Sequence, residues 1–218
     1  EAMLRGEIDI AIHSMKDMPT FMPEGIMLHA INERLDSRDV FISKKAKNIR
    51  ELKEGATVGT ASLRRKAQLL NLRPDLQIVP LRGNIDTRLK KIADGDIDAT
   101  LLAFAGLKRL GREDVIMSIV DSEEILPAVG QGVLAATCRE EDLRANTFIA
   151  ALAHPATTLA VLAERAMLGV LDGSCHTPIA GQAQFFSEEE LTLHGLILRP
   201  DGVEKAEVTL TGNGNEAE

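Results

Sequence analysis

The stretch Ala56-Thr-Val-Gly-Thr-Ala-Ser-Leu-Arg-Arg-Lys-Ala-Gln-Leu-Leu-Asn-Leu72 decides the fold of this chain. A short apolar run at 56–59 predicts a strand, and the periodic segment at 62–72 that follows it predicts a helix. The same order returns in the strand predicted at 77–81 and in the helix that Asn84 can cap. Alternation of strands and helices is typical of βαβ units, so an α/β fold with mixed, largely parallel sheets is expected.

Further elements are predicted on both sides of this stretch. Strands are expected at 8–12, 26–31, 39–43, 99–104 and 133–137. His154-Pro155 opens a long helix to about residue 170, because proline suits the first turn. The tail then alternates apolar and polar residues at 179–185, 191–198 and 203–210. This alternation predicts a C-terminal α+β domain with a three-stranded antiparallel sheet that buries one face.

Composition narrows the class of protein. The 218 residues are 44% apolar and 27% charged, which is typical of soluble globular proteins. No apolar run reaches the length of about 18 residues that suggests a membrane helix. The net charge of −8 and the absence of Trp and Tyr argue against nucleic-acid binding. We therefore expect a cytoplasmic monomer with no nucleic-acid or membrane partner.

The cysteines give neither a disulfide framework nor a metal site. There are only two, Cys138 and Cys175, so reduced thiols are expected and no four-ligand zinc site can form from them. Cys138 ends an apolar strand and is expected to stay free. Histidines at metal-ligand spacing are also missing from the sequence, so no metal is predicted.

The first candidate site is His13-Ser-Met-Lys-Asp-Met-Pro19, directly after the first predicted strand. Polar residues at the carboxyl end of a strand in an α/β sheet commonly line a ligand crevice. Ser14 and Lys16 can donate hydrogen bonds to an anion, and Asp17 is the only carboxylate of the loop. The alternative is that Ser14 caps a turn and that Lys16 and Asp17 are solvated turn residues.

Arginines follow two other strands where a helix begins. Ser62, Arg64 and Arg65 open the first of these helices, and Arg82 and Arg88 flank the start of the next. Helix N-termini favour anions, and guanidiniums add charge-assisted hydrogen bonds. Neither segment has a dinucleotide-binding or P-loop pattern, so a nucleotide is not the favoured anion. The alternative is a solvated basic helix face that pairs with acidic neighbours.

The segment Leu171-Asp-Gly-Ser-Cys-His-Thr-Pro178 places Cys175 on a loop between the long helix and the C-terminal strands. A thiol on a loop is open to chemistry, and together with several anion-binding positions it suggests a covalently held, polycarboxylated species. A lone cysteine can instead be a small buried hydrophobe. A hydrolase that uses Cys175 and His176 is disfavoured, because adjacent residues rarely present nucleophile and base to each other.

Taken together, these segments resemble the porphobilinogen deaminase family, also called hydroxymethylbilane synthases. The matching segments run in family order and cover nearly the whole chain: 13–19, 59–65, 81–88, 126–132 and 173–178. The resemblance implies two lobes built like type II periplasmic binding proteins, which face each other across a cleft, and a third domain that carries the cysteine.

The resemblance also implies domain boundaries. Domain 1 would comprise 1–32 and 133–152, domain 2 would comprise 33–132, and domain 3 would comprise 153–218. Segments 31–36 and 129–132 would then link the lobes and act as hinges. The family has a further sheet segment with basic cleft residues ahead of the matching region, so the chain is expected to be incomplete at its N-terminus, and its C-terminal end also looks short.

The activity that the resemblance implies is that of a transferase in haem biosynthesis. A dipyrromethane primer, held through a thioether to Cys175, would be extended head to tail by four porphobilinogens with loss of ammonia, and hydrolysis would release hydroxymethylbilane. Asp17 would be the catalytic carboxylate. The residues that would bind the carboxylates of primer and substrate are Ser14, Lys16, Ser62, Arg64, Arg65, Arg82, Arg88 and Arg109. A non-catalytic two-lobed receptor for a small dicarboxylate, with a structural Cys175, is the alternative.

The residue types suit this chemistry independently of the resemblance. Loss of ammonia from an aminomethylpyrrole leaves a cation, which a fixed carboxylate stabilises. The same carboxylate can handle the protons of the reaction. Each pyrrole carries two carboxylates, and these explain many anion-binding arginines in an acidic chain.

Overall fold

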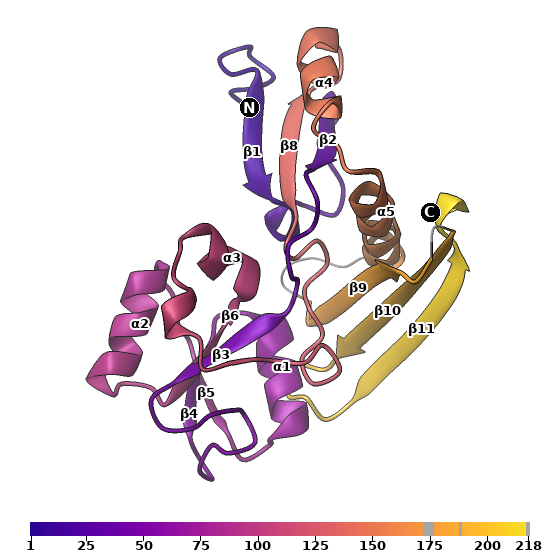
Figure 1. Ribbon diagram of the computed structural model, residues 1–218. Helices are drawn as coiled ribbons and strands as arrows, with labels where there is room; N and C mark the ends of the chain where they lie inside the picture. The colour runs from indigo at the N-terminus through magenta and orange to yellow at the C-terminus, as the bar shows by residue number, and fades with distance from the viewer. Residues whose placement is uncertain (172–176, 188, 217–218) are drawn as a thin grey trace.

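The computed structural model describes residues 1–171, 177–187 and 189–216 (Figure 1). The strands of these residues form three sheets, of three, five and three strands. In Figure 1 the sheet at the top contains the start of the chain, the five-stranded sheet lies at the lower left, and the third sheet lies at the right beside a long helix. The chain passes from the first sheet to the second and later returns, so two segments link them.

The first sheet is antiparallel throughout. It consists of β1 (Ile10–Ser14), β8 (Leu134–Arg139) and β2 (Ile26–Ile31), with β8 in the middle. Ser14 and Ile31 both lie opposite Leu134. Three strand ends therefore meet at the edge where the chain crosses to the second sheet. Helix α4 (Leu143–Ala150), which the sequence did not predict, packs on β8 and β2.

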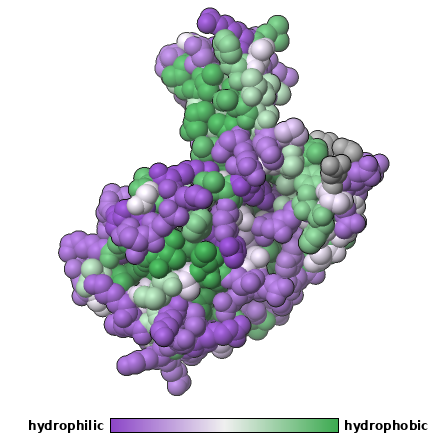
Figure 2. Space-filling model, in the orientation of Figure 1, coloured by the Kyte–Doolittle hydropathy of each residue, from purple (hydrophilic) through white to green (hydrophobic). Residues whose placement is uncertain are grey.

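One face of this region is apolar. Figure 2 shows hydrophobic residues gathered on the visible face of the upper part of the molecule, below hydrophilic residues at its tip. Ile10 and Ile12 are 40% and 58% exposed. This face of β1 therefore has no covering layer among the described residues.

The second sheet is mixed. Its strands, in spatial order, are β5 (Gln77–Val79), β4 (Thr57–Gly59), β6 (Ala99–Ala103), β3 (Asp39–Ser43) and β7 (Ser118–Ile119). β4 pairs in parallel with β5 and β6, whereas β3 is antiparallel to β6 and β7. Parallel pairing is thus less extensive than the sequence predicted. Helices connect β4 to β5 and β5 to β6, and only such crossovers give parallel neighbours.

Two helices of this sheet begin where the sequence predicted, one next to Ser62 and one after the Asn84 cap. The helices are α1 (Leu63–Leu72), α2 (Ile85–Asp94) and α3 (Phe104–Arg109), and a 3-10 turn η2 (Glu113–Val115) follows. Ser62 accepts a hydrogen bond from the backbone N–H of Arg65 at 3.3 Å, and Asn84 accepts one from Thr87 at 2.9 Å. These bonds satisfy N–H groups that a helix start leaves unpaired. Helix α3 was missed because six residues carry too little periodicity.

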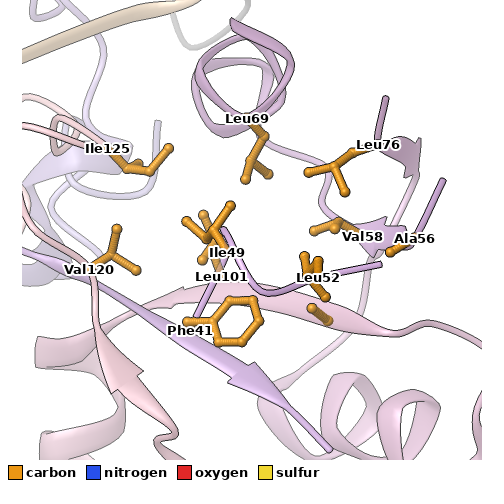
Figure 3. Packing of buried hydrophobic residues seen from close by; sticks show 11 residues of the cluster. Phe41, Ile49, Leu52, Ala56, Val58, Leu69, Leu76, Leu101, Val120 and Ile125 are labelled. Atoms are coloured by element: carbon orange, nitrogen blue, oxygen red, sulfur yellow. The ribbon is translucent and has the colours of Figure 1, made fainter. Parts of the chain in front are cut away.

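The core of the second sheet lies between β3, β4, β6 and α1. Figure 3 shows Phe41, Val58 and Leu101 gathered with Leu69 of α1 in one cluster. All four are at most 1% exposed. Full burial of such side chains contributes roughly 1.5–3 kcal/mol each. This core holds α1, and with it Arg64 and Arg65, rigidly against the sheet.

The third sheet follows the predicted pattern. It contains β9 (Ile179–Phe185), β10 (Glu190–Leu198) and β11 (Lys205–Asn213), all antiparallel, with α5 (Pro155–Val170) before it and the 3-10 turn η3 (Gly214–Glu216) after it. His154 caps α5, and Gly202 (φ +76°) forms the predicted turn before β11. The sequence predicted that one face of this sheet is buried, but this fails for β11, because every one of its residues is exposed. α5 packs on β9 and β10, and β11 lies beyond it at the edge (Figure 1).

No helix among the described residues is both long and apolar enough to cross a membrane. Within the same residues, no group of three or more His, Cys, Asp and Glu side chains is arranged to hold a metal ion.

Candidate functional site

Residues 13–19, which we call the Asp17 loop, are anchored to the core by Met15. Strand β1 ends at Ser14, and the 3-10 turn η1 (Met15–Asp17) follows at once. Met15 is 2% exposed and packs with Val133 and Val161, and its N–H donates to the carbonyl of Val133 at 3.0 Å. Asp17, two residues on, is exposed. The loop thus presents a carboxylate to solvent from a fixed backbone.

Gly130 allows the second linking segment to lie against this loop. Its φ is +70°, and a Cβ at this position would come within 2.5 Å of Cγ of Met15. A side chain here would push the Asp17 loop away or strain the backbone, since L residues rarely adopt this conformation. Contact between the loop and the segment therefore requires glycine.

Lys16 lies in a positively charged environment. Burial, and then the charges of Arg65 and Arg64, lower the pKa of Lys16 to about 8, against the opposing charges of Asp39 and Asp17. The effect of Arg65 and Arg64 places Lys16, the chain neighbour of Asp17, within electrostatic reach of the start of α1. An anionic ligand would favour the charged form of Lys16.

A buried carboxylate binds both arginines of α1. Asp39 is 0% exposed and opens β3. Its Oδ2 accepts from Arg64 Nη2 at 2.8 Å and from Arg65 Nε at 2.9 Å, and its Oδ1 accepts from Arg65 Nη2 at 2.8 Å. Burial by itself would raise the pKa of Asp39, but the two guanidiniums outweigh it and hold that pKa well below its usual range.

This pairing refines the expectation for Arg64 and Arg65. The alternative of pairing with an acidic neighbour is realised, but the guanidiniums are buried rather than solvated, with side chains 6% and 8% exposed. Arg64 also donates from Nη1 to the carbonyl of Leu126. Arg64 is thus occupied by protein groups, and any role of the pair toward a ligand falls mainly to Arg65.

The other predicted binding residues are spread over the second sheet's helices. Arg88 is half-buried and donates from Nε to the carbonyl of Gly83 at 2.9 Å. Burial, and then the charge of Arg65, lower the pKa of Arg88, so Arg88 lies within electrostatic reach of Arg65. Arg109 donates from Nη2 to the carbonyl of Gly132 at 2.9 Å. Arg82 is exposed, and no contact with this cluster is recorded for it among the described residues.

Lys16 and Arg88 each lie within electrostatic reach of Arg65, and we call these three residues the cationic cluster. Ser14 is the last residue of β1, and Ser62 is the N-cap of α1. Cys175 lies outside the described residues, so its predicted position relative to Asp17 is not part of this geometry. Cys138 is a free, buried thiol.

Sequence reasoning missed residues that hold the site together. Arg165 of α5 donates to the carbonyls of Pro19 and Thr20 at 2.9 and 2.8 Å, and so attaches the Asp17 loop to the third sheet's helix. Asp39 was missed although it opens the apolar run Asp39-Val-Phe-Ile-Ser43. A carboxylate at the start of a fully buried strand needs a cationic partner, and this signal was available.

Glu164 is a second missed carboxylate. It is 0% exposed and accepts from Arg34 Nη1 and Nη2 at 2.7 and 3.0 Å. It also accepts from the backbone N–H groups of Gly130 and Ala183, at 2.6 and 2.7 Å. One side chain of α5 therefore bonds to both linking segments and to β9.

Two family models match the chain. The model described as "Porphobilinogen deaminase, dipyromethane cofactor binding domain" matches residues 1–147, and "Porphobilinogen deaminase, C-terminal domain" matches residues 158–218. The chain belongs to the porphobilinogen deaminase family. The Asp17 loop, Asp39 and the cationic cluster all fall in the part that matches the cofactor-binding model, and Cys175 falls in the part that matches the C-terminal model.

Curated relatives agree with this assignment. The chain is 52% identical over 212 residues to the porphobilinogen deaminase of Nitrobacter winogradskyi, an alignment that covers 97% of this chain and 67% of that protein. It is 48% identical over 217 residues to the porphobilinogen deaminase of Bacillus subtilis, covering 99% of this chain and 69% of that protein. The chain thus spans about two thirds of the length of these porphobilinogen deaminases.

Solved structures with a similar arrangement include two binding proteins. A putative methionine-binding lipoprotein from Bacillus subtilis has 13% sequence identity and a TM-score of 0.47, with 69% of this chain and 72% of that chain covered. A periplasmic substrate-binding protein of an ABC transporter from Coxiella burnetii has 18% identity and a TM-score of 0.47, with 75% and 78% covered. The α/β class predicted for the chain, with a C-terminal antiparallel sheet, is confirmed by the strand order of the three sheets.

Proposed function

We propose that this member of the porphobilinogen deaminase family is a transferase that joins four porphobilinogens head to tail on a dipyrromethane primer and releases hydroxymethylbilane and ammonia. Family membership supports the reaction. The observation that carries the site assignment is the exposed Asp17 carboxylate beside the cationic cluster. A cytoplasmic monomer without nucleic-acid or membrane partners stays a prediction.

The residues present fit the dipyrromethane. Its acetate and propionate groups are anions, and Lys16, Arg65, Arg88 and Arg109 are cationic donors near the Asp17 loop and the linking segments. When bound, the dipyrromethane supplies the terminal pyrrole to which the new units are added. Arg88 and Arg109 would hold its carboxylates, because charge-assisted hydrogen bonds to carboxylates are among the strongest available to a protein.

Asp17 would act on the substrate. As ammonia leaves the aminomethyl group of porphobilinogen, positive charge develops on the pyrrole, and a carboxylate in a fixed position stabilises that charge. Met15 supplies the fixed position, since it is buried while Asp17 faces outward. Asp17 can also accept the proton that the pyrrole α-carbon gives up.

Lys16 and Arg65 would orient the substrate for this step. Porphobilinogen, like the primer, carries two carboxylates per ring. A ring held through its carboxylates keeps its aminomethyl carbon at a constant place relative to Asp17, and this removes much of the entropic cost of the reaction.

Stoichiometry tests the proposed reaction. The full-length protein is incubated with porphobilinogen, and the porphobilinogen consumed, the ammonia released and the tetrapyrrole formed are measured. We expect one ammonia per porphobilinogen and one linear tetrapyrrole per four porphobilinogens. Porphobilinogen that binds without any release of ammonia would overturn the proposal and favour a binding protein.

Cys175 is the proposed attachment point, and this part is tested separately. The intact mass of the full-length protein should include two pyrrole units, and Cys175→Ala should lack them. Cys138→Ala is the matched control, because Cys138 is buried in the first sheet and should not change the adduct. An adduct that persists in Cys175→Ala would show that another residue holds the primer.

A further inference from the structure

The carboxylate of Asp39 accepts four hydrogen bonds. Both of its oxygens accept two hydrogen bonds: Oδ2 from Arg64 and Arg65, and Oδ1 from Arg65 and from Gln131 Nε2 at 2.7 Å. Its backbone is fixed as well, since it pairs with Ala103 in the sheet and its carbonyl accepts from the N–H of Val120. Asp39 is therefore a rigid anchor for the side chains of Arg64 and Arg65.

This anchor fixes the orientation of Arg65. Nε and Nη2 of Arg65 lie on one edge of the guanidinium, and both donate to Asp39. For the remaining nitrogen, Nη1, no bond is recorded among the described residues. A planar guanidinium held along one edge has its opposite edge aimed in one direction. Lys16 and Arg88 lie within electrostatic reach of Arg65.

Asp39 is also connected to the linking segments. Gln131 lies in the second linking segment and is 1% exposed. Its Nε2 donates to Asp39 and to the carbonyl of Ser37 at 2.6 Å, and Ser37 Oγ accepts from Gln182 of β9 at 2.5 Å. Asp39 is thus connected by hydrogen bonds to the second linking segment, to Ser37 just after the first, and to the third sheet.

Arg64 and Arg65 are two cations that share the one carboxylate of Asp39, so this group of three keeps a net positive charge. Lys16 and Arg88, which lie within electrostatic reach of Arg65, add to that positive charge. Asp39 is saturated by its four bonds and cannot move to meet the other cations. A bound carboxylate would complete the balance at the edge of Arg65 that Asp39 does not use.

We propose that Asp39 is a positioning residue, which fixes Arg65 so that the unused guanidinium edge receives a pyrrole carboxylate beside Lys16 and Arg88. The proposal rests on the proposed function. Asp39 itself would touch neither substrate nor primer, because its carboxylate is fully buried under the two arginines.

The test uses Asp39→Asn and Asp39→Glu in the full-length, primer-loaded protein, with kcat and KM measured from pH 6 to 10. Asp39→Asn removes the charge that Arg65 binds, so KM for porphobilinogen should rise about tenfold or more, the value of one charge-assisted hydrogen bond. kcat should change less, because Asp17 is untouched. Asp39→Glu keeps the charge but moves it by one methylene, so KM should also rise.

A pH readout separates positioning from loss of structure. The charged groups that act on Lys16 are Arg65, Asp39, Asp17 and Arg64, and Asp39 favours its protonated form. The alkaline decrease of kcat/KM should therefore begin at lower pH in Asp39→Asn and stay in place in Asp39→Glu. A loss of folded structure alone would reduce activity equally at all pH values.

Asp36→Asn is the matched control. Asp36 lies three residues earlier, and its carboxylate is likewise bound by an arginine, Arg38, at 2.6 to 3.1 Å, but at the surface. Its KM should equal that of the unmodified protein. KM values for Asp39→Asn and Asp39→Glu within twofold of the unmodified protein would overturn the proposal, as would a loss in kcat alone.

The two proposals fail in different ways. If Asp39→Asn does not fold, Asp39→Glu carries the test, since it preserves the buried charge. If the unmodified protein releases no ammonia from porphobilinogen, the proposed function fails. If the unmodified protein is active and both Asp39 variants keep its KM, only the positioning role fails.

Discussion

Asp17 is exposed, whereas Met15 beneath it is buried, so the carboxylate can be changed without disturbing the core. We predict that Asp17→Asn lowers kcat by roughly 10²–10⁴-fold, because an amide neither stabilises a developing cation as a carboxylate does nor accepts its proton. The melting temperature and the primer adduct should be retained. The measurement is steady-state turnover of porphobilinogen by the folded variant. Turnover within threefold of the unmodified protein would show that a group other than Asp17 stabilises the cation and accepts the proton.

Lys16 gives the site a pH dependence. Its pKa is about 8, so the ammonium predominates below pH 8 and is lost as pH rises through that value. Since the ammonium binds carboxylates, kcat/KM should fall as the pH rises above about 8. In Lys16→Arg the decrease should disappear from this range, because a guanidinium stays charged to above about pH 12. An identical alkaline decrease in both proteins would assign it to the substrate or to another residue.

At the scale of residues, the sequence predicted the local backbone features around the candidate site. The helix start near Ser62, the Asn84 cap and the loop that carries Asp17 follow from neighbours within a few positions, and the structure contains them. The Asp39 pair with Arg65 joins positions 26 residues apart. Such a contact depends on how α1 packs on the sheet, and neither residue's neighbours determine it.

Helix α5 is the element that binds the other parts of the chain together, through Glu164. We predict that Glu164→Gln destabilises the fold by about 3–5 kcal/mol, because the amide leaves Arg34 as a buried charge without its partner and cannot satisfy every donor that faces it. Urea unfolding followed by circular dichroism measures the loss. Glu33→Gln, which alters an exposed carboxylate next to Arg34, should change stability by less than about 0.5 kcal/mol. Equal effects of the two substitutions would contradict this role of Glu164.

At the scale of elements, strong periodicity and turn chemistry predicted most strands and the long helices within a few residues. The exceptions have physical causes. β7 has two residues and α3 has six, so neither shows a period. Parallel pairing was overestimated because strand direction is set by the connections, and β3 enters its sheet from a linking segment rather than from a crossover helix. The exposure of β11 could not be predicted, since an alternating pattern does not say which neighbour covers it.

At the scale of the whole molecule, a single catalytic carboxylate must serve a pyrrole chain that lengthens with each addition. The linking segments at 31–36 and 129–132 stay the predicted hinges, and Glu164 of α5 is hydrogen-bonded to both of them. We predict that the distance between the Cys175 loop and Asp17 changes between the primer-only and the most extended state, while each sheet keeps its internal distances. Distance labels on the loop and on β1 measure this. An unchanged distance would mean that the pyrrole chain folds up within a static site.

The division into domains, with boundaries at 32/33, 132/133 and 152/153, also stays a prediction. It would be tested by limited proteolysis of the full-length protein. Cleavage should concentrate near 31–36 and 129–132 when the Arg34–Glu164 pair is broken by Glu164→Gln. Cleavage confined to other segments would place the flexible connections elsewhere.

The most direct measurement of the central claim is the intact mass of the full-length protein during a single round of reaction with limiting porphobilinogen. The account predicts a starting mass that already includes two pyrrole units, followed by a ladder of one to four further units that resolves when the tetrapyrrole is released. Asp17→Asn should start from the same primer-loaded mass and extend it far more slowly. A starting mass without any pyrrole adduct, or a mass that porphobilinogen never increases, would contradict the account.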